Sequence, residues 1–380
     1  MHIPALDGLR GLAILLVMIF HQTLLGTMPG QLDMHFTCTF DRIWSILAGF
    51  GWCGVDLFFV LSGFLITGIL YDARGKNGYF RSFYARRILR IFPLYYLVVA
   101  FCLLVLPHIH NAKSDRFGHV AGDEIWYWTY LSNFIIARKH FRHGILDVSW
   151  TLAIEEQFYL VWPAVVLLFS RKVLLWICGG LVLTAIALRT CLFYHGAHPI
   201  FIMTMTPCRM DSLAIGAALS LLARGQRGIT RYFTVAKFVA AAGGALLLGY
   251  LIWQGPSWDG GSFGQCLGYS VLALFFAAIL CLSLNLKPTG IPSRVLTSQF
   301  MRLLGRLSYA IYLFNFPLRA VIRDTAYGPS KFLIMFGSQM PGQLIFYAMA
   351  MTITIFAAWV SWHVWEMPFL RLKRFFPMPK

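Results

Sequence analysis

The sequence predicts an all-α fold: a polytopic membrane helix bundle of about ten transmembrane helices with both termini in the cytoplasm. Of its 380 residues, 58% are hydrophobic and only 12% are charged, whereas soluble domains average about 25% charged residues. The apolar residues form ten segments, each near the ~20 residues that cross a bilayer core. Basic residues gather at the ends of these segments, as membrane topology requires. We expect residues 1–380 to form a single integral-membrane domain.

The predicted spans follow one another along most of the chain. A further apolar stretch, 126–136, is too short to cross a membrane and is predicted to form an interfacial or re-entrant helix. The first span could be mistaken for a cleaved signal peptide, but nine further spans of the same character favour its retention. The ten spans are approximately 8–28, 46–70, 88–107, 148–169, 173–194, 207–224, 234–253, 265–285, 301–320 and 342–365.

Lysines and arginines are distributed unequally between the two sides that these spans define. With the N-terminus inside, 20 of the 32 Lys and Arg residues lie in cytoplasmic segments, and the positive-inside rule favours this orientation. Topology therefore explains the net charge of +17 without a nucleic-acid partner. The eight cysteines show no metal-ligand spacing, so we predict small buried thiols and no metal site.

The first span, "LDGLRGLAILLVMIFHQ" (6–22), carries two ionisable residues, Arg10 and His21. Their separation corresponds to about 20° more than three full helical turns, so both lie on one face. Alone, Arg10 could be a topology anchor whose side chain snorkels to the membrane surface, and His21 could hydrogen-bond a neighbouring helix. Ionisable groups inside a membrane are rare and usually line a path or a site, which favours a functional role.

A helix rise of 1.5 Å per residue gives predicted depths for four further polar residues. Glu155 is at nearly the depth of His21, Asn315 is near mid-depth, and Arg209 and Asp211 are toward the outer side. Several of these groups could meet in one interior cavity. Glu155 and Glu156 diverge by about 100°, so one is expected to face the cavity and the other a structural partner. Arg209 and Asp211 could instead form a structural ion pair.

The stretch "FRSFYARRILRIFPLYY" places a cluster of arginines at the predicted cytoplasmic entry to a span. Arg87 and Arg90 are three residues apart and are neighbours on one helical face. Guanidinium groups bind phosphates bidentately. The cluster could therefore recognise anionic lipid or a phosphorylated cofactor such as coenzyme A.

Taken in order, these motifs resemble transmembrane acyltransferase family 3, a group of bacterial O-acyltransferases with about ten membrane helices. The resemblance covers nearly the whole chain. It rests on "LDGLRGLAILLVMIFHQ", "GVDLFFVLSGFLIT", "FYARRILRIFPLYY", "SWTLAIEEQFYLVWP", "RMDSLAIG", "LGRLSYAIYLFNFPL" and "WEMPF".

The resemblance implies a multi-pass protein of the bacterial inner (cytoplasmic) membrane. Such a protein moves an acyl group, most commonly acetyl, from cytoplasmic acyl-CoA to a hydroxyl of an envelope glycan, glycolipid or glycoside. Acyl-CoA is then a donor substrate, and no cofactor is bound permanently. The implied partners are acyl-CoA, a carbohydrate acceptor and membrane lipid, without nucleic acid.

The resemblance also implies roles for individual residues. The family's catalytic histidine corresponds to His21, its first-helix arginine to Arg10, and its double-arginine motif to Arg87 and Arg90. One departure is Asn315, at a position where members often carry histidine. Asparagine cannot shuttle a proton, so only a hydrogen-bonding role is expected there.

The chemistry of acyl transfer suggests how these residues act. His21 would be the general base for the acceptor hydroxyl, and Glu155 would orient or charge-stabilise it. The oxyanion formed during attack could be stabilised by Arg10, Arg209 or Asn315. Arg10 is better placed to guide the donor inward from the cytoplasm. An acyl-histidine intermediate is also compatible with these residues.

We further expect Arg209, Asp211 and Asn315 to contribute to substrate binding. The competing interpretation of the buried polar residues is a proton-coupled membrane transporter. Carriers often show inverted repeats with matching broken helices, and no such repeat is evident in this sequence.

Overall fold

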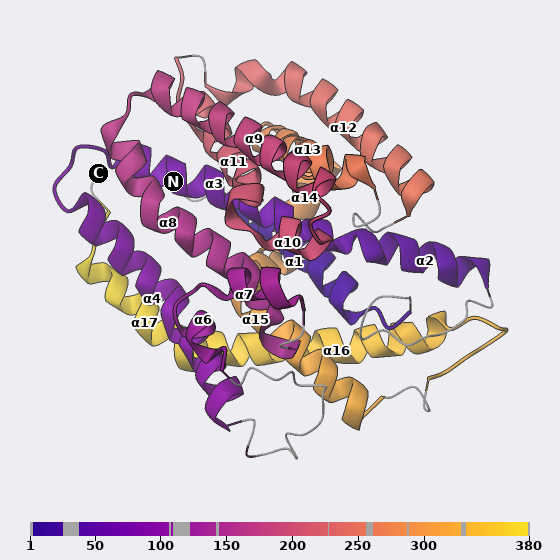
Figure 1. Ribbon diagram of the computed structural model, residues 1–380. Coiled ribbons are helices and arrows are strands. Elements are labelled where there is room, and N and C mark those ends of the chain that lie inside the picture. The colour runs from indigo at the N-terminus through magenta and orange to yellow at the C-terminus, as the bar shows by residue number, and fades with distance from the viewer. Residues whose placement is uncertain are drawn as a thin grey trace. The chain divides into compact units, whose positions relative to one another are not determined.

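The structure, a computed structural model, describes residues 3–25, 38–105, 108, 122–141, 144–226, 228–255, 261–286, 289–327 and 332–378. Over this part of the chain the backbone is predominantly helical (Figure 1). It includes an isolated bridge between Met335 and Ser338. The prediction of an all-α membrane fold is confirmed.

Eight helical stretches among the described residues are long and apolar enough to cross a membrane. They are Pro4–Gln22, Thr39–Asp72, Tyr79–Val105, Gly144–Leu168, Arg171–Tyr194, Ile229–Gln254, Gly264–Leu284 and Met340–Phe375. The two remaining predicted spans, 207–224 and 301–320, are also helical, within α11 (Thr206–Ala223) and α15 (Gln299–Thr325). The total of ten spans and the cytoplasmic location of both termini stay predictions.

The chain divides into two compact units. The first comprises Met1–Val55, Gly249–Ser257 and Pro288–His363, and the second comprises Asp56–Leu248, Trp258–Lys287 and Val364–Lys380. The expectation of a single domain stays a prediction.

The first unit is built around the packing of α1 (Pro4–Gln22) against α15. Pro4 occupies the first position of α1, where its missing N–H costs no hydrogen bond. Ser298 caps α15 by accepting from the backbone N–H of Met301 at 3.3 Å. The unit also contains α2 (Thr39–Gly49), η1 (Phe50–Cys53), α14 (Ile291–Leu296) and α16 (Met340–Ser361).

Two glycines explain how closely α1 and α15 approach. A Cβ atom added to Gly305 of α15 would overlap the backbone oxygen of Asp7, and one added to Gly11 of α1 would overlap the backbone oxygen of Met301 in α15. No side chain can therefore be accommodated at either position without moving a helix backbone. Gly305 and Gly11, the second glycine of the "LDGLRG" motif, thus determine the spacing of the helix pair that carries His21 and Asn315.

The second unit places α11 against α9 (Arg171–Tyr194), α13 (Tyr269–Leu284) and α8 (Trp150–Leu168). The stretch 126–136 forms two short helices, α6 (Glu124–Trp128) and α7 (Ser132–Lys139). The other elements of the second unit are α3 (Gly54–Asp72, from Asp56 onward), α4 (Tyr79–Ala100), η2 (Phe101–Val105), η3 (Gly144–Ser149), α10 (Pro199–Thr204), η4 (Ile229–Tyr232), α12 (Phe233–Gln254, as far as Leu248), η5 (Gly264–Gly268), the end of η7 (Trp362–Glu366), α17 (Met367–Arg371) and η8 (Leu372–Phe375).

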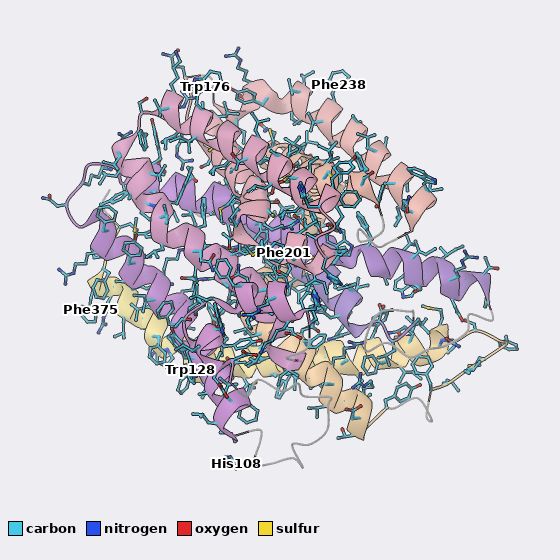
Figure 2. All side chains as sticks on the ribbon, in the orientation of Figure 1. His108, Trp128, Trp176, Phe201, Phe238 and Phe375 are labelled. Carbon is cyan, nitrogen blue, oxygen red and sulfur yellow. The ribbon has the colours of Figure 1, made fainter. Side chains whose placement is uncertain are left out.

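Large apolar side chains project from the outer helices of the second unit. Figure 2 shows Trp176 on α9 and Phe238 on α12 pointing away from their helices, and the two residues are 73% and 72% exposed. Aromatic side chains exposed to this degree are unfavourable in water and favourable in hydrocarbon. The exposed aromatic side chains are therefore consistent with a multi-pass membrane protein, as the long apolar helices also indicate.

Candidate active site

His21 lies in the last turn of α1 and is partly exposed. Its ring meets that of Phe316 edge-on at a centroid distance of 5.5 Å. The side-chain nitrogen of Asn315 lies 3.0 Å from His21 Nδ1. Because Nδ1 is occupied by Asn315, the other ring nitrogen, Nε2, is the atom available to a substrate. The structure therefore brings together two of the residues that the sequence singled out.

Asn315 is fully buried in α15 and is held from its other side by Gln22. Gln22 Nε2 donates to Asn315 Oδ1 at 2.7 Å. The same nitrogen lies 3.4 Å from the hydroxyl oxygen of Thr354 on α16. A chain of hydrogen bonds thus runs from α16 through α1 to α15 and ends on the candidate catalytic histidine.

The backbone immediately after His21 is fixed by a second set of contacts from α16. Gln343 Nε2 donates to the carbonyl oxygen of Gln22 at 3.1 Å, and Gln343 Oε1 accepts from the N–H of Leu24 at 2.8 Å. The hydroxyls of Thr23 and Tyr347 are hydrogen-bonded to each other. These bonds satisfy backbone groups that the end of α1 would leave unpaired, and they restrict the position of His21.

Arg319 is a further member of this site, one helical turn beyond Asn315 in α15. It is 5% exposed, and its Nη2 donates to the carbonyl oxygen of Thr23 at 3.3 Å. Its positive charge acts on the imidazole of His21. The sequence-based interpretation missed Arg319, although an arginine within the apolar stretch "FPLRAVI" was a usable signal.

Arg10 lies in α1 and is partly exposed. Its predicted role as a guide for the donor stays a prediction. Glu155, Arg209 and Asp211 belong to the second unit. The predicted convergence of these groups with His21 in one cavity therefore also stays a prediction.

Glu155 connects α8 to α3 within the second unit. The hydroxyl of Ser62 donates to Glu155 Oε1 at 2.6 Å, and the indole N–H of Trp162 donates to Thr67 Oγ1 at 2.8 Å between the same helices. The neighbouring Glu156 lies within the electrostatic influence of Arg87. Both carboxylates are partly exposed.

Arg209 and Asp211 each form a buried ion pair, but not with one another. Arg209 Nη2 lies 2.6 Å from Asp56 Oδ1, and Arg189 Nη1 lies 2.9 Å from Asp211 Oδ2. The suggested structural pair between Arg209 and Asp211 was therefore wrong in its partners. The reason is geometric: residues two apart on a helix point to different faces, so each meets a different neighbouring helix.

Polar and aromatic groups lie beside both ion pairs. The Arg209 guanidinium lies 3.9 Å from the ring centroid of Tyr269, and the Ser270 hydroxyl bonds Asp211. All four charged side chains are at most 1% exposed. The Arg209–Asp56 pair nevertheless keeps three buried atoms without a hydrogen-bond partner, Arg209 Nε, Arg209 Nη1 and Asp56 Oδ2. The predicted substrate-binding role of Arg209 and Asp211 stays untested. The sequence reasoning missed Asp56 and Arg189, each an isolated charge in an apolar run.

The arginine cluster lies near the start of α4, together with the C-terminal segment. Arg86 Nη1 donates to the carbonyl oxygens of Lys373 and Phe376 at 3.1 and 3.2 Å. The ammonium group of Lys373 interacts electrostatically with Arg86, Arg87 and Arg90. The Arg87 guanidinium lies 5.0 Å from the ring centroid of Tyr159. Four cations thus gather at one end of the second unit, an arrangement suited to an anion with several charges.

Among the described residues, no three His, Cys, Asp or Glu side chains come together in a way that could hold a metal ion. All eight cysteines lie within the described ranges as free thiols. Six of them are buried, as predicted; Cys191 is exposed and Cys38 is partly exposed.

Comparison with known proteins gives a consistent result. The chain is 29% identical over 335 residues to the peptidoglycan O-acetyltransferase OatA of Listeria monocytogenes, covering 83% of this chain and 49% of that protein. It is 31% identical over 340 residues to the putative peptidoglycan O-acetyltransferase YrhL of Bacillus subtilis, covering 83% and 48%. Putative O-acetyltransferases of Staphylococcus aureus are 26% identical, with 97% of this chain and 57% of theirs covered.

The chain thus spans about half the length of the curated relatives it matches. No solved structure matches it significantly. A family model described as an acyltransferase domain matches residues 3–363, which is nearly the whole chain. The sequence motifs, the helical membrane fold and this match together show that the chain belongs to acyltransferase family 3 and is an acyltransferase.

Proposed function

We propose that this acyltransferase moves an acetyl group from acyl-CoA, entering from the cytoplasmic side, to a hydroxyl of an envelope glycan in the bacterial inner membrane. The observation that carries the proposal is the contact between His21 Nδ1 and the side-chain amide of Asn315. It makes Nε2 the ring nitrogen proposed for the reaction, provided that the amide turns its oxygen toward Nδ1–H. A hydroxyl is a poor nucleophile near neutral pH, and a positioned histidine is the usual base for it.

In the proposed reaction, the acceptor oxygen attacks the thioester carbonyl carbon while its proton passes to His21 Nε2. The tetrahedral intermediate collapses as the carbon–sulfur bond breaks, and the proton passes from His21 to the departing thiolate. The products are the O-acyl ester and the free thiol, so every atom and charge is accounted for. We propose Glu155 as the carboxylate that stabilises the imidazolium.

Negative charge develops on the thioester oxygen during attack and requires a stabilising group. Arg319 is a candidate for this role because its charge already acts on the imidazole of His21 and its side chain is almost fully buried. Arg10 is proposed to guide the donor from the cytoplasmic end of α1.

The donor's phosphates are proposed to bind at the arginine cluster. Arg87 and Arg90 provide guanidinium groups, and Lys373 brings a further charge to the same place. Coenzyme A carries several phosphate groups, and guanidinium–phosphate pairs are among the strong charge-assisted hydrogen bonds. This binding mode would select a nucleotide-bearing thioester over a short one.

The choice of acetyl and of a glycan acceptor is supported by the relatives, whose names describe peptidoglycan O-acetyltransferases. A peptidoglycan sugar hydroxyl is therefore the first acceptor to test. Purified protein in liposomes should release free coenzyme A from acetyl-CoA only when a soluble peptidoglycan fragment is present, and the fragment should gain one acetyl group by mass spectrometry. Solute flux without thioester consumption would support a transporter instead.

A further inference from the structure

Four polar side chains from three helices form one hydrogen-bonded chain in the first unit. It runs from Thr354 on α16 to Gln22 on α1, then to Asn315 on α15 and to His21 Nδ1. Thr354, Gln22 and Asn315 are each 0% exposed. Water therefore has little access to exchange with these bonds, and the direction of each bond depends on that of its neighbour.

In the direction recorded, Gln22 donates to Asn315 Oδ1, so the Asn315 nitrogen faces His21 Nδ1. That nitrogen can only donate, so Nδ1 must accept. A neutral imidazole then carries its proton on Nε2. In this tautomer Nε2 is a donor and cannot take a proton from an acceptor hydroxyl.

The opposite direction uses the same heavy-atom positions. Rotating the two terminal amides exchanges their oxygen and nitrogen atoms, which have nearly the same size and shape. Asn315 Oδ1 would then accept from Nδ1–H, and Asn315 Nδ2 would donate to Gln22 Oε1. The Thr354 hydroxyl can donate to the same Gln22 oxygen. His21 Nε2 is left with a free lone pair, as a general base requires.

Each direction leaves one atom of the Gln22 amide without a hydrogen-bond partner. In the recorded direction Gln22 Oε1 is buried without a hydrogen-bond partner. In the opposite direction Gln22 Nε2 occupies the position of Oε1 and has no partner instead. A buried polar atom without a partner costs free energy, so the Gln22 amide carries the cost that sets the balance between the two directions.

We propose that Gln22 is a positioning residue for catalysis: it turns the Asn315 amide and thereby selects which ring nitrogen of His21 carries the proton. The inference rests on the proposed function of His21 as the base. Once His21 takes up the acceptor proton, both ring nitrogens carry hydrogen, and Nδ1–H needs an acceptor. That acceptor is present only when Asn315 Oδ1 faces the imidazole ring.

A double-mutant cycle separates this role from simple packing. Gln22→Met keeps the side-chain volume but cannot orient an amide, and we expect a fall in kcat of about tenfold, with the KM for acetyl-CoA unchanged. Asn315→Asp offers acceptor oxygens in every direction and needs no orienting partner. In the Asn315→Asp background, Gln22→Met should therefore change kcat by less than about twofold. An equal fractional loss in both backgrounds would overturn the proposal.

Nitrogen-15 NMR of the histidine side chains gives a readout that does not depend on activity. The His21 signals are identified by their loss in His21→Ala. We expect the Nδ1–H tautomer to dominate in Asn315→Asp, and its population in Gln22→Met to differ from that in the unmodified protein. Identical tautomer populations in the unmodified protein and Gln22→Met would overturn the relay.

The outcomes also distinguish this inference from the proposed function. If His21→Ala retains turnover, the function assigned to His21 fails. If His21→Ala is inactive while Gln22→Met matches the unmodified protein in kcat and tautomer, the relay fails and the base assignment stands. Folded yield by size-exclusion chromatography is measured for every variant, so that activity is expressed per folded protein.

Discussion

Asn315 places its side-chain nitrogen 3.0 Å from Nδ1 of His21, although 294 positions separate the two residues in the sequence. The contact joins the end of α1 to the middle of α15 and holds the imidazole of His21 through Nδ1. The proposed chemistry depends on this pair, and the predictions below test the pair and the groups around it.

His21→Ala is expected to lower turnover by roughly 10²–10⁴-fold, the range for loss of a general base. Expression and membrane insertion should be unchanged, because His21 is partly exposed and one side chain contributes little to a helix bundle. Turnover is measured as coenzyme A release in liposomes. His363→Ala is the matched control, since His363 is exposed and its Nδ1 lies 2.8 Å from the carbonyl oxygen of Trp359, four residues earlier. Near-normal turnover in His21→Ala would exclude the base role.

The double variant Arg87→Ala with Arg90→Ala should raise the KM for acetyl-CoA more than that for a truncated acetyl thioester lacking the nucleotide phosphates. The reason is that only acetyl-CoA carries the nucleotide phosphates that the two guanidinium groups would bind. KM is measured for both donors, with the exposed Arg231→Ala as control. An equal change for both donors would instead favour a role in topology or anionic-lipid binding.

Glu155→Gln is expected to remove most of the activity, because the neutral amide keeps size and hydrogen bonding but no longer stabilises an imidazolium. Glu156→Gln should cost less turnover. If Glu156 instead pairs with a buried arginine, its variant should lower folded yield. Turnover per folded protein is compared for the two variants. Greater sensitivity at Glu156 would reverse the assignment.

Gly305→Ala should lower the folded yield and the apparent Tm, because its Cβ would overlap the backbone oxygen of Asp7 and separate α1 from α15. Activity should fall with it, since this helix pair positions Asn315 beside His21. Gly179→Ala in α9 is the control: a Cβ there meets no atom within 4 Å, and alanine is the better helix former. Equal stability of the two variants would contradict the predicted overlap.

Asp56→Leu alone should destabilise the protein by about 3–5 kcal/mol, because it leaves the Arg209 guanidinium buried without its carboxylate. Adding Arg209→Met should restore folded yield, since an apolar pair can replace a buried ion pair. Thermal unfolding and turnover are measured for both variants. If the double variant is folded and active, Arg209 is structural; if it is folded but has a raised KM, the predicted substrate-binding role is supported.

The sequence by itself determined the class of protein and singled out several candidate site residues. The length of an apolar segment is dictated by bilayer thickness, so helices and their approximate bounds are readable from local composition. Ionisable residues in apolar segments are rare for an energetic reason, and this rarity singled out His21 and Arg209. The "LDGLRG" motif likewise contains Gly8, where the structure finds close helix packing.

Only the tertiary structure decided which of these residues are partners. Asp56 pairs with Arg209, and Gln22 bonds Asn315, across 153 and 293 positions. Such pairings depend on how helices rotate and cross, and the sequence of one helix carries no information about the face its neighbour presents. Gln22 was overlooked because a glutamine beside a conspicuous histidine has no distinguishing pattern. Its importance arises from packing, which buries its amide and leaves it Asn315 and Thr354 as hydrogen-bond partners.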